Sequence, residues 1–129
     1  MPQGRTQRRV LIIDDHPDAA DLLAEMLTLH DYATCVAYGG QEGLVALSRF
    51  RPEVVLLDIG MPHMDGCQVA ARIRQMDQIA QPVLIAYTAW NDDRAKSRIL
   101  AAGFDLHLTK PAEFKVLLDT LLTASGPLR

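Results

Sequence analysis

Hydrophobic positions along this chain fall into two kinds of segment. Short runs of consecutive Val, Leu and Ile have the length of strands, and the segments between them space their apolar residues as amphipathic helices do. The run VVLL is the most hydrophobic, and its lack of polar alternation indicates a strand buried on both faces, as in a parallel sheet. The pattern predicts five strands, over residues 8–14, 32–37, 52–58, 82–87 and 104–109.

A helical segment follows each of these strands. In the first, Leu22, Leu23 and Leu27 recur at helical spacing, and Pro17 suits the opening turn because its missing N–H would have no partner there. Gly103 marks the end of the fourth helix. The predicted helices lie within residues 16–31, 39–50, 67–76, 92–102 and 111–123.

Strands and helices that alternate in this way predict an α/β fold with a parallel, doubly wound sheet. Right-handed crossovers would place helices on both faces of that sheet. The 129 residues contain no internal repeat, low-complexity tract or linker. We therefore expect one domain over residues 8–124, with an N-terminal leader over 1–7 and a C-terminal tail over 125–129.

Composition and charge narrow the class of protein. The chain is 49% hydrophobic and 22% charged, as globular domains are, and its net charge of -3 gives no general attraction to nucleic acid. It has no apolar run of transmembrane length and no signal peptide. Cys35 and Cys67 show no CxxC spacing, which indicates buried thiols in a reducing compartment. We expect a cytoplasmic protein that binds neither nucleic acid nor membrane directly.

Polar side chains follow four of the five predicted strands. Asp14 and Asp15 come after the first, Asp58 after the third, Thr88 after the fourth and Lys110 after the fifth. The carboxyl ends of parallel strands share one edge of the sheet, and ligands of open α/β sheets bind there. The sequence therefore predicts that these five side chains form one site.

The chemistry of this predicted site favours phosphoryl transfer. Three carboxylates at one edge raise one another's pKa values unless a cation lies between them, and Mg²⁺ binds a few carboxylates while keeping positions for phosphoryl oxygens. Lys110 adds a fixed positive charge, and the hydroxyl of Thr88 can donate to a phosphoryl oxygen. Asp58 stands alone at the end of the most buried strand, so we predict it as the nucleophile.

Four motifs carry a resemblance to a known family: IIDDHPD, VVLLDIGMPHMDG, AYTA and LTKP. In this order and spacing they resemble the receiver domain of bacterial two-component response regulators, over residues 8–124. Each motif alone is common, whereas all four at the ends of the right strands are specific. The resemblance implies a flavodoxin-like sheet with strand order 2-1-3-4-5 and five flanking helices.

The resemblance also implies roles for individual residues. Asp58 would accept the phosphoryl group of a phosphohistidine on a histidine kinase or phosphotransfer protein. Asp14 and Asp15 match the acidic pair that serves Mg²⁺, with Asp15 as the expected direct ligand. Asp58 itself and the backbone carbonyl of Gly60 are expected as further metal ligands.

Three further residues match the family pattern, and two others are notable at their positions. Thr88 and Lys110 match the switch hydroxyl and the phosphate-binding lysine, and in this family the peptide bond before Pro111 is usually cis. His107 stands where many receivers have a switch Tyr or Phe, and it resembles receivers of hybrid sensor kinases and single-domain regulators. Trp90 is placed beside the phosphorylation site, where it would restrict water and slow the loss of the acyl phosphate.

Plainer interpretations exist for several of these residues. Asp14 and Asp15 also suit the N-cap of a helix, since acids before a helix favour its dipole. Both interpretations hold together if Asp15 binds the metal while Asp18 or a neighbour serves the start of the helix. Thr88 is an ordinary strand residue, and Lys110 could be a solvated charge. Three histidines are expected on loops or helix surfaces and not as metal ligands, because their scatter offers no metal spacing: His16, His30 and His63.

We expect this protein to act as a phosphorylation switch and not as an enzyme that turns over a substrate. Phosphorylation of Asp58 would draw Thr88 and Lys110 toward the new charge and alter the surface of the fourth helix, fifth strand and fifth helix. That surface would contact a downstream protein, an output domain outside this chain, or a second copy in a homodimer.

Two other functions stay open. One is a metal-dependent phosphohydrolase that forms an aspartyl phosphate, although the chain has no room for a cap domain or a substrate pocket. The other is a degenerate receiver that serves only as a docking module, although all of the motif residues are present.

Overall fold

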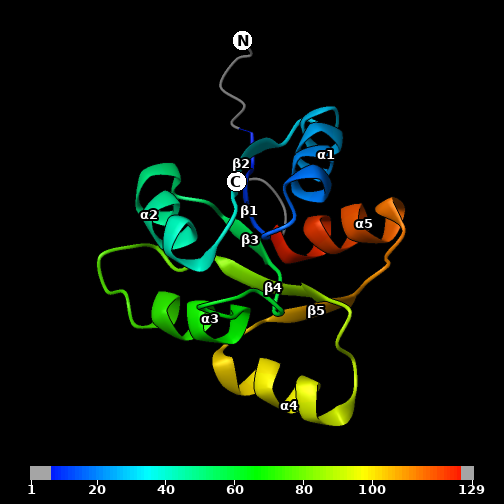
Figure 1. The fold of residues 1–129 in the computed structure, drawn as a ribbon. Coiled ribbons are helices and arrows are strands. Elements are labelled where there is room, and N and C mark those ends of the chain that lie inside the picture. The colour runs from blue at the N-terminus through cyan, green and yellow to red at the C-terminus, as the bar shows by residue number, and fades with distance from the viewer. Residues whose placement is uncertain (1–6, 126–129) are drawn as a thin grey trace.

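The structure, a computed structural model, describes residues 7–125. The predicted leader and tail, residues 1–7 and 125–129, lie almost wholly outside the described residues. Five parallel strands form one sheet in the order β2-β1-β3-β4-β5, which confirms the predicted fold class and order (Figure 1). The strands are β1 Arg9–Ile13, β2 Ala33–Ala37, β3 Val54–Leu57, β4 Val83–Thr88 and β5 Leu106–Thr109.

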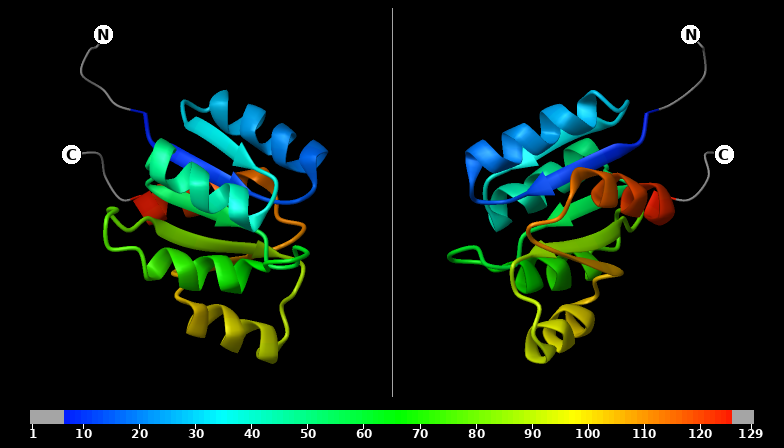
Figure 2. Two further views of the ribbon diagram at one scale, coloured as in Figure 1. Left: turned by 60° about the vertical axis from the view of Figure 1, so that its left-hand side comes forward. Right: turned by 90° about the vertical axis from the view of Figure 1, so that its right-hand side faces the viewer.

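One helix follows each strand, and the helices cover both faces of the sheet. They are α1 Pro17–Thr28, α2 Gly40–Phe50, α3 Gly66–Arg74, α4 Asp93–Ala102 and α5 Phe114–Ser125. The helices α2, α3 and α4 lie on one face, and α1 and α5 lie on the other (Figures 1 and 2). None of the helices in residues 7–125 is both long and apolar enough to cross a membrane.

The central strand β3 shows why the sheet needs both layers of helices. Its residues alternate between two buried clusters: Val54 and Leu56 pack with α1 and α5, while Val55 and Leu57 pack with α2 and α3. All four are between 0% and 1% exposed, as the unbroken VVLL run predicts.

Two helix ends lie at the proline and the glycine that the sequence analysis singled out. Pro17 is the first residue of α1, and Gly103 ends α4 in a left-handed conformation with φ 103°, which favours glycine. The two largest differences are three residues each: α1 ends at Thr28 and not at residue 31, and α5 begins at Phe114 and not at residue 111, because the chain after β5 bends before it turns helical.

Candidate functional site

The carboxyl ends of four strands bring the predicted residues to one edge of the sheet. Asp14 and Asp58 directly follow β1 and β3, and the backbone N–H of Asp58 donates to the carbonyl of Ile13 at 3.0 Å. Thr88 is the last residue of β4, and Lys110 follows β5 and donates its backbone N–H to the carbonyl of Thr88 at 2.9 Å. Parallel pairing of the strands therefore sets the spacing of the site.

Lys110 is directed into the site and not into solvent. Its Nζ lies 3.2 Å from Oδ2 of Asp14, to which it donates a hydrogen bond, and 3.7 Å from Oδ2 of Asp58. The ammonium also lies 5.0 Å from the centre of the Tyr87 ring, within cation–π range. The peptide bond between Lys110 and Pro111 is cis, as the resemblance implies.

The two buried carboxyl groups have opposite pKa shifts. Burial is the largest cause of a raised pKa of Asp58, and the charges of Asp14 and Asp15 add to it. Together they outweigh Lys110 and the backbone N–H of Gly60, which lower this pKa. Burial acts on Asp14 in the same direction, but hydrogen bonds from His16 and the charge of Lys110 outweigh it and lower the pKa of Asp14. Asp58 is thus the group for which ionisation is most costly without an added cation.

Thr88 and Trp90, at and after the end of β4, lie close to the loop that follows β3. Thr88 is 2% exposed, and its Oγ1 accepts a hydrogen bond from the backbone N–H of Trp90 at 3.2 Å. Trp90 is 46% exposed, and a Cβ built on Gly60 would lie 3.8 Å from Cζ2 of its ring. The backbone N–H of Gly60 in turn lies 3.4 Å from Oδ1 of Asp58. The indole is therefore a neighbour of the carboxylate's loop.

Gly66, at the start of α3, is a residue whose role the sequence analysis missed. Its backbone N–H donates to the carbonyl of Ile59 at 2.9 Å, and a Cβ at this position would overlap the carbonyl oxygen of Asp58. The sequence signal was present in the Asp-Gly pair of HMDG, but it indicated only a loop. The glycine lets α3 begin directly against the end of β3.

His16 is an exposed residue just before α1, as predicted, but its ring lies against the acidic cluster. It is the N-cap of α1, so neither acidic residue before it caps that helix, and Asp18 lies inside the first turn. Its ring makes no capping hydrogen bond; Nδ1 lies instead 2.9 Å from Oδ1 of Asp14. That bond is the largest cause of a raised pKa of His16. Its position next to the two aspartates put the contact within reach, but nothing in the sequence indicated the direction of the ring.

The donor set fits a divalent cation. Asp14, Asp15, His16 and Asp58 each place one ligand atom within 4.8 Å of the others. Within the described residues, Oδ1 of Asp15 is buried without a hydrogen-bond partner, and a buried carboxylate oxygen is costly unless a proton donor or a cation meets it. Carboxylate oxygens are the ligands that Mg²⁺ prefers.

His107 is not part of this cluster. It pairs in register with Ala86 of β4, two residues before Thr88, and its Nε2 is buried without a hydrogen-bond partner among the described residues. His30 lies at the end of α1 against the ring of Phe114, and His63 is exposed in the loop after β3. Those two predictions of surface positions are confirmed.

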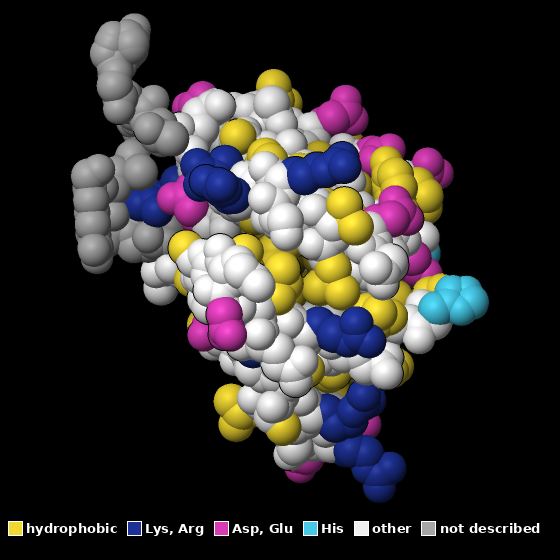
Figure 3. Space-filling model, turned by 90° about the vertical axis from the view of Figure 1, so that its left-hand side faces the viewer, with side chains coloured by type: hydrophobic (Ala, Val, Ile, Leu, Met, Phe, Trp, Pro, Cys, Tyr) yellow, Lys and Arg dark blue, Asp and Glu magenta, His cyan; other side chains and the backbone are white. Residues whose placement is uncertain are grey.

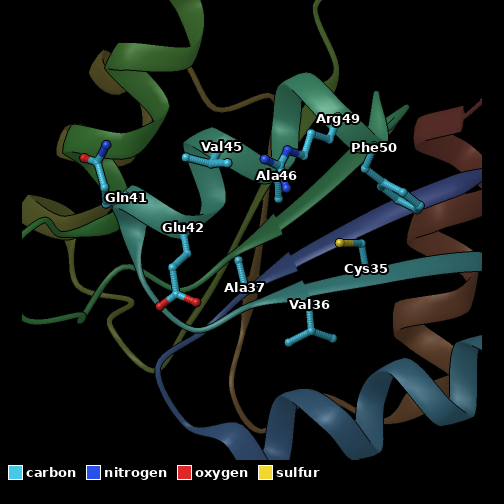
Figure 4. Close-up of a pocket in the computed structure, with 9 residues that line it drawn as sticks. All are labelled: Cys35, Val36, Ala37, Gln41, Glu42, Val45, Ala46, Arg49 and Phe50. Carbon is cyan, nitrogen blue, oxygen red and sulfur yellow. The ribbon is translucent and has the colours of Figure 1, made fainter.

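A hollow of about 570 Å³ lies elsewhere, between α2 and the edge strand β2 (Figure 4). Cys35 and Phe50 point into it on the same side of β2, and none of its lining residues is a predicted site residue. Apolar side chains surrounded by Lys and Arg are visible on that side of the molecule (Figure 3). Cys35 is only half-buried, whereas Cys67 is buried as predicted, and burial raises the pKa of its thiol.

Comparison with known proteins identifies the family of this chain. A family model described as the response regulator receiver domain matches residues 10–122. The chain belongs to this family. It is a receiver domain of two-component systems, a class of signalling module that binds Mg²⁺ at an acidic site and works with histidine kinases or phosphotransfer proteins and with output domains.

Curated relatives include receivers inside longer proteins. The chain is 38% identical over 112 residues to the sensor histidine kinase RcsC of Escherichia coli, covering 87% of this chain and 12% of that protein. It is 34% identical to the transcriptional regulatory protein PrrA of Mycobacterium tuberculosis, covering 98% of this chain and 54% of that protein. An uncharacterized 14.6 kDa protein of Leptolyngbya boryana is 34% identical, with 86% and 85% covered. The chain thus spans about half or less of RcsC and PrrA.

Solved structures agree with this assignment. The chemotaxis protein CheY4 of Vibrio cholerae has a TM-score of 0.87 at 25% identity, covering 92% of this chain and 99% of that one. The BeF3-activated receiver domain of RstA from Klebsiella pneumoniae has a TM-score of 0.85 at 25% identity, covering 93% and 100%.

Proposed function

We propose that Asp58 accepts a phosphoryl group from the phosphohistidine of a histidine kinase or phosphotransfer protein, in a reaction that requires Mg²⁺. One observation carries the proposal: the buried Asp58 carboxylate lies 3.7 Å from Nζ of Lys110 and within the same acidic cluster as Asp14 and Asp15. A nucleophile between a fixed ammonium and a cation site suits phosphoryl transfer, where charge builds on the equatorial oxygens.

The chemical step leaves the phosphoryl group on the aspartate. An oxygen of Asp58 bonds to phosphorus, the bond from phosphorus to the donor imidazole nitrogen breaks, and the imidazole leaves with that electron pair. Asp14, Asp15, Asp58 and the carbonyl of Gly60 would hold Mg²⁺, which supplies positive charge for the phosphoryl oxygens.

Lys110 and Thr88 would respond to the new negative charge on Asp58. Lys110 now donates to Asp14, and it can transfer this hydrogen bond to a phosphoryl oxygen without leaving the site. The hydroxyl of Thr88 accepts from the backbone of Trp90, so a Thr88 that turns toward the phosphoryl group also moves the loop before α4. The movement of Thr88 would reach the α4–β5–α5 surface through packing. His107 of β5 stands in this region, at the position where many receivers have a switch Tyr or Phe.

That surface is the proposed contact for partners. The occupant is a downstream protein, an output domain of a longer chain, or a second copy in a homodimer. We further propose residues 8–124 as the receiver domain and the cytoplasm as its compartment, since Cys35 and Cys67 are both free thiols. Direct binding to nucleic acid or membrane is not part of the proposed function.

The experiment is incubation with a small phosphodonor, with and without Mg²⁺, followed by intact mass. We expect one phosphoryl adduct on the wild type with Mg²⁺, none without it, and none on Asp58→Asn. Asp18→Asn is the matched control, because Asp18 is an exposed acid of α1 outside the cluster, and it should behave as the wild type.

Three results would contradict the proposal. An adduct that persists in Asp58→Asn would move the acceptor elsewhere. Absence of any adduct on the wild type would favour a receiver that only docks. Steady turnover of a simple phosphomonoester would favour the phosphohydrolase.

Trp90 gives a second prediction for this site. Its ring lies beside the Asp58–Gly60 loop, so it should keep attacking water from the acyl phosphate. We expect Trp90→Ala to shorten the half-life of the phosphorylated protein by about threefold or more. The measurement is loss of the adduct by intact mass over time, with Tyr38→Ala, another exposed aromatic, as the control. An unchanged half-life in Trp90→Ala would refute this role.

A further inference from the structure

The His16 ring lies among the three carboxylates of the acidic cluster. Its Nδ1 is 2.9 Å from Oδ1 of Asp14, 3.3 Å from Oδ1 of Asp15 and 3.9 Å from Oδ2 of Asp58. The imidazole therefore presents a nitrogen donor to the same space that the carboxylate oxygens surround.

These separations suit the ligands of a single ion. With metal–ligand distances of 2.0–2.1 Å, adjacent ligands lie about 3 Å apart and opposite ligands about 4 Å apart. Nδ1 stands at the distance of an adjacent ligand from both Asp14 and Asp15. The oxygen of Asp15 nearest to it is the buried one that lacks a hydrogen-bond partner among the described residues.

The backbone of His16 is also held beside Asp14. His16 has an extended conformation, φ -106° and ψ 92°, and its backbone N–H donates to Oδ1 of Asp14 at 3.0 Å. Pro17 then starts α1. The ring caps no helix, and its side chain is 66% exposed, so packing does not explain its direction toward the acids.

We propose that His16 is a nitrogen ligand of this metal site, through which the site binds transition-metal ions such as Ni²⁺ and Zn²⁺ more tightly than Mg²⁺. The inference rests on the proposed function, which places a cation among Asp14, Asp15 and Asp58. Imidazole suits Zn²⁺ and Ni²⁺, whereas carboxylate and carbonyl oxygens suit Mg²⁺. A site with one imidazole and several carboxylates therefore separates the two classes of ion more strongly than its oxygens alone would.

The test exchanges the nitrogen donor for an oxygen donor and keeps the start of the helix. His16→Asn suits this purpose, because asparagine is among the best N-cap residues. Dissociation constants for Ni²⁺, Zn²⁺ and Mg²⁺ are measured by titration calorimetry on untagged protein at pH 8, since ligation needs the neutral imidazole. His63→Asn is the matched control: it removes an exposed histidine outside the cluster, at a φ of 69° that asparagine tolerates.

We expect His16→Asn to weaken the binding of Ni²⁺ and Zn²⁺ roughly tenfold or more while Mg²⁺ binding changes less than about threefold. His63→Asn should change none of the three constants. Equal losses for all three ions, unchanged Ni²⁺ and Zn²⁺ affinities, or a wild type that binds neither ion would each overturn the inference. A melting curve checks that the variants are folded, and His16→Ala serves as a second variant with no side-chain donor.

The proposed function is tested by a separate measurement on the same proteins. Mg²⁺-dependent phosphorylation of Asp58 in the wild type tests the receiver site itself. The ratio of Ni²⁺ to Mg²⁺ affinity in His16→Asn tests only the nitrogen ligand. Failure of one measurement is therefore distinguishable from failure of the other.

Discussion

Gly66 packs against the main chain at the end of β3, the strand that delivers the predicted phosphoacceptor. A Cβ there would overlap the carbonyl oxygen of Asp58 and lie 2.8 Å from Cα of Ile59. Neither neighbour is a flexible side chain, so the backbone itself would have to shift. The position of Asp58 thus depends on a residue that carries no side chain.

We expect Gly66→Ala to lower the free energy of unfolding by roughly 1–3 kcal/mol, the usual cost of an added methyl without space. Denaturant unfolding measures this change. Gly39→Ala is the matched control, because the nearest atom to its added Cβ is the flexible end of Glu42 at 3.7 Å. Its φ of -170° is extended, so the control should lose less than about 1 kcal/mol, mostly as a weaker helix cap. A Gly66→Ala protein as stable as the control would contradict the expectation.

Among residues, the sequence predicted chemistry better than contacts. Asp58 and Lys110 were predictable because their side chains follow strands whose ends must meet. The contact of His16 with Asp14 was not, because it depends on the ring's orientation at the turn before α1. Periodicity and spacing carry no information on such an orientation.

The helices differ in how they begin. The side chain of Asp65 caps α3 in a capping box with Gln68, and Asp92 caps α4 by accepting from the backbone N–H of Ala95 at 2.8 Å. The N-cap of α1, His16, makes no such bond. Gly39, the N-cap of α2, makes none either, so side-chain caps are described at the starts of α3 and α4 and not at those of α1 and α2.

Asp92→Ala should remove one cap and lower the free energy of unfolding by about 1 kcal/mol. Asp92→Asn should leave the free energy almost unchanged, because asparagine caps about as well as aspartate. Both variants are measured by thermal or denaturant unfolding. If both lose stability equally, the charge of Asp92 matters and not the hydrogen bond to Ala95.

The elements themselves were largely predictable. The buried run of β3 and the proline and glycine that bound α1 and α4 gave local signals that the fold agrees with. The start of α5 was placed three residues too early, because no local signal in the sequence marks the bend of the chain after β5.

At the scale of the whole molecule, the acidic cluster should make the free energy of unfolding depend on the concentration of a divalent cation. Burial and neighbouring carboxylates make the charge of Asp58 unfavourable, so a cation that binds the folded state should stabilise it by mass action. At a hundredfold excess over the dissociation constant, this stabilisation is about 2.7 kcal/mol.

We therefore expect Mg²⁺ to raise the melting temperature of the wild type and to have much less effect on Asp15→Asn. Asp15 has the buried oxygen without a hydrogen-bond partner among the described residues, so the cation should depend on it most. Asp18→Asn, which removes an acid of α1 outside the cluster, should respond as the wild type does. An equal rise in Asp15→Asn would show that Mg²⁺ acts elsewhere.

The sequence by itself determined the fold class, the strand order through its resemblance, and the set of polar residues at the sheet's edge. These depend on hydrophobic periodicity and on which residue follows each strand, and both are local properties of the chain. Only the tertiary structure decided the contacts: Lys110 on Asp14, Trp90 beside Gly60, Gly66 against Asp58 and His16 among the acids. The contacts of Lys110 and Trp90 join segments that are distant in sequence, so they follow from how the strands pair. Those of His16 and Gly66 are local, and they depend on the direction of a ring and on how closely α3 packs against the end of β3.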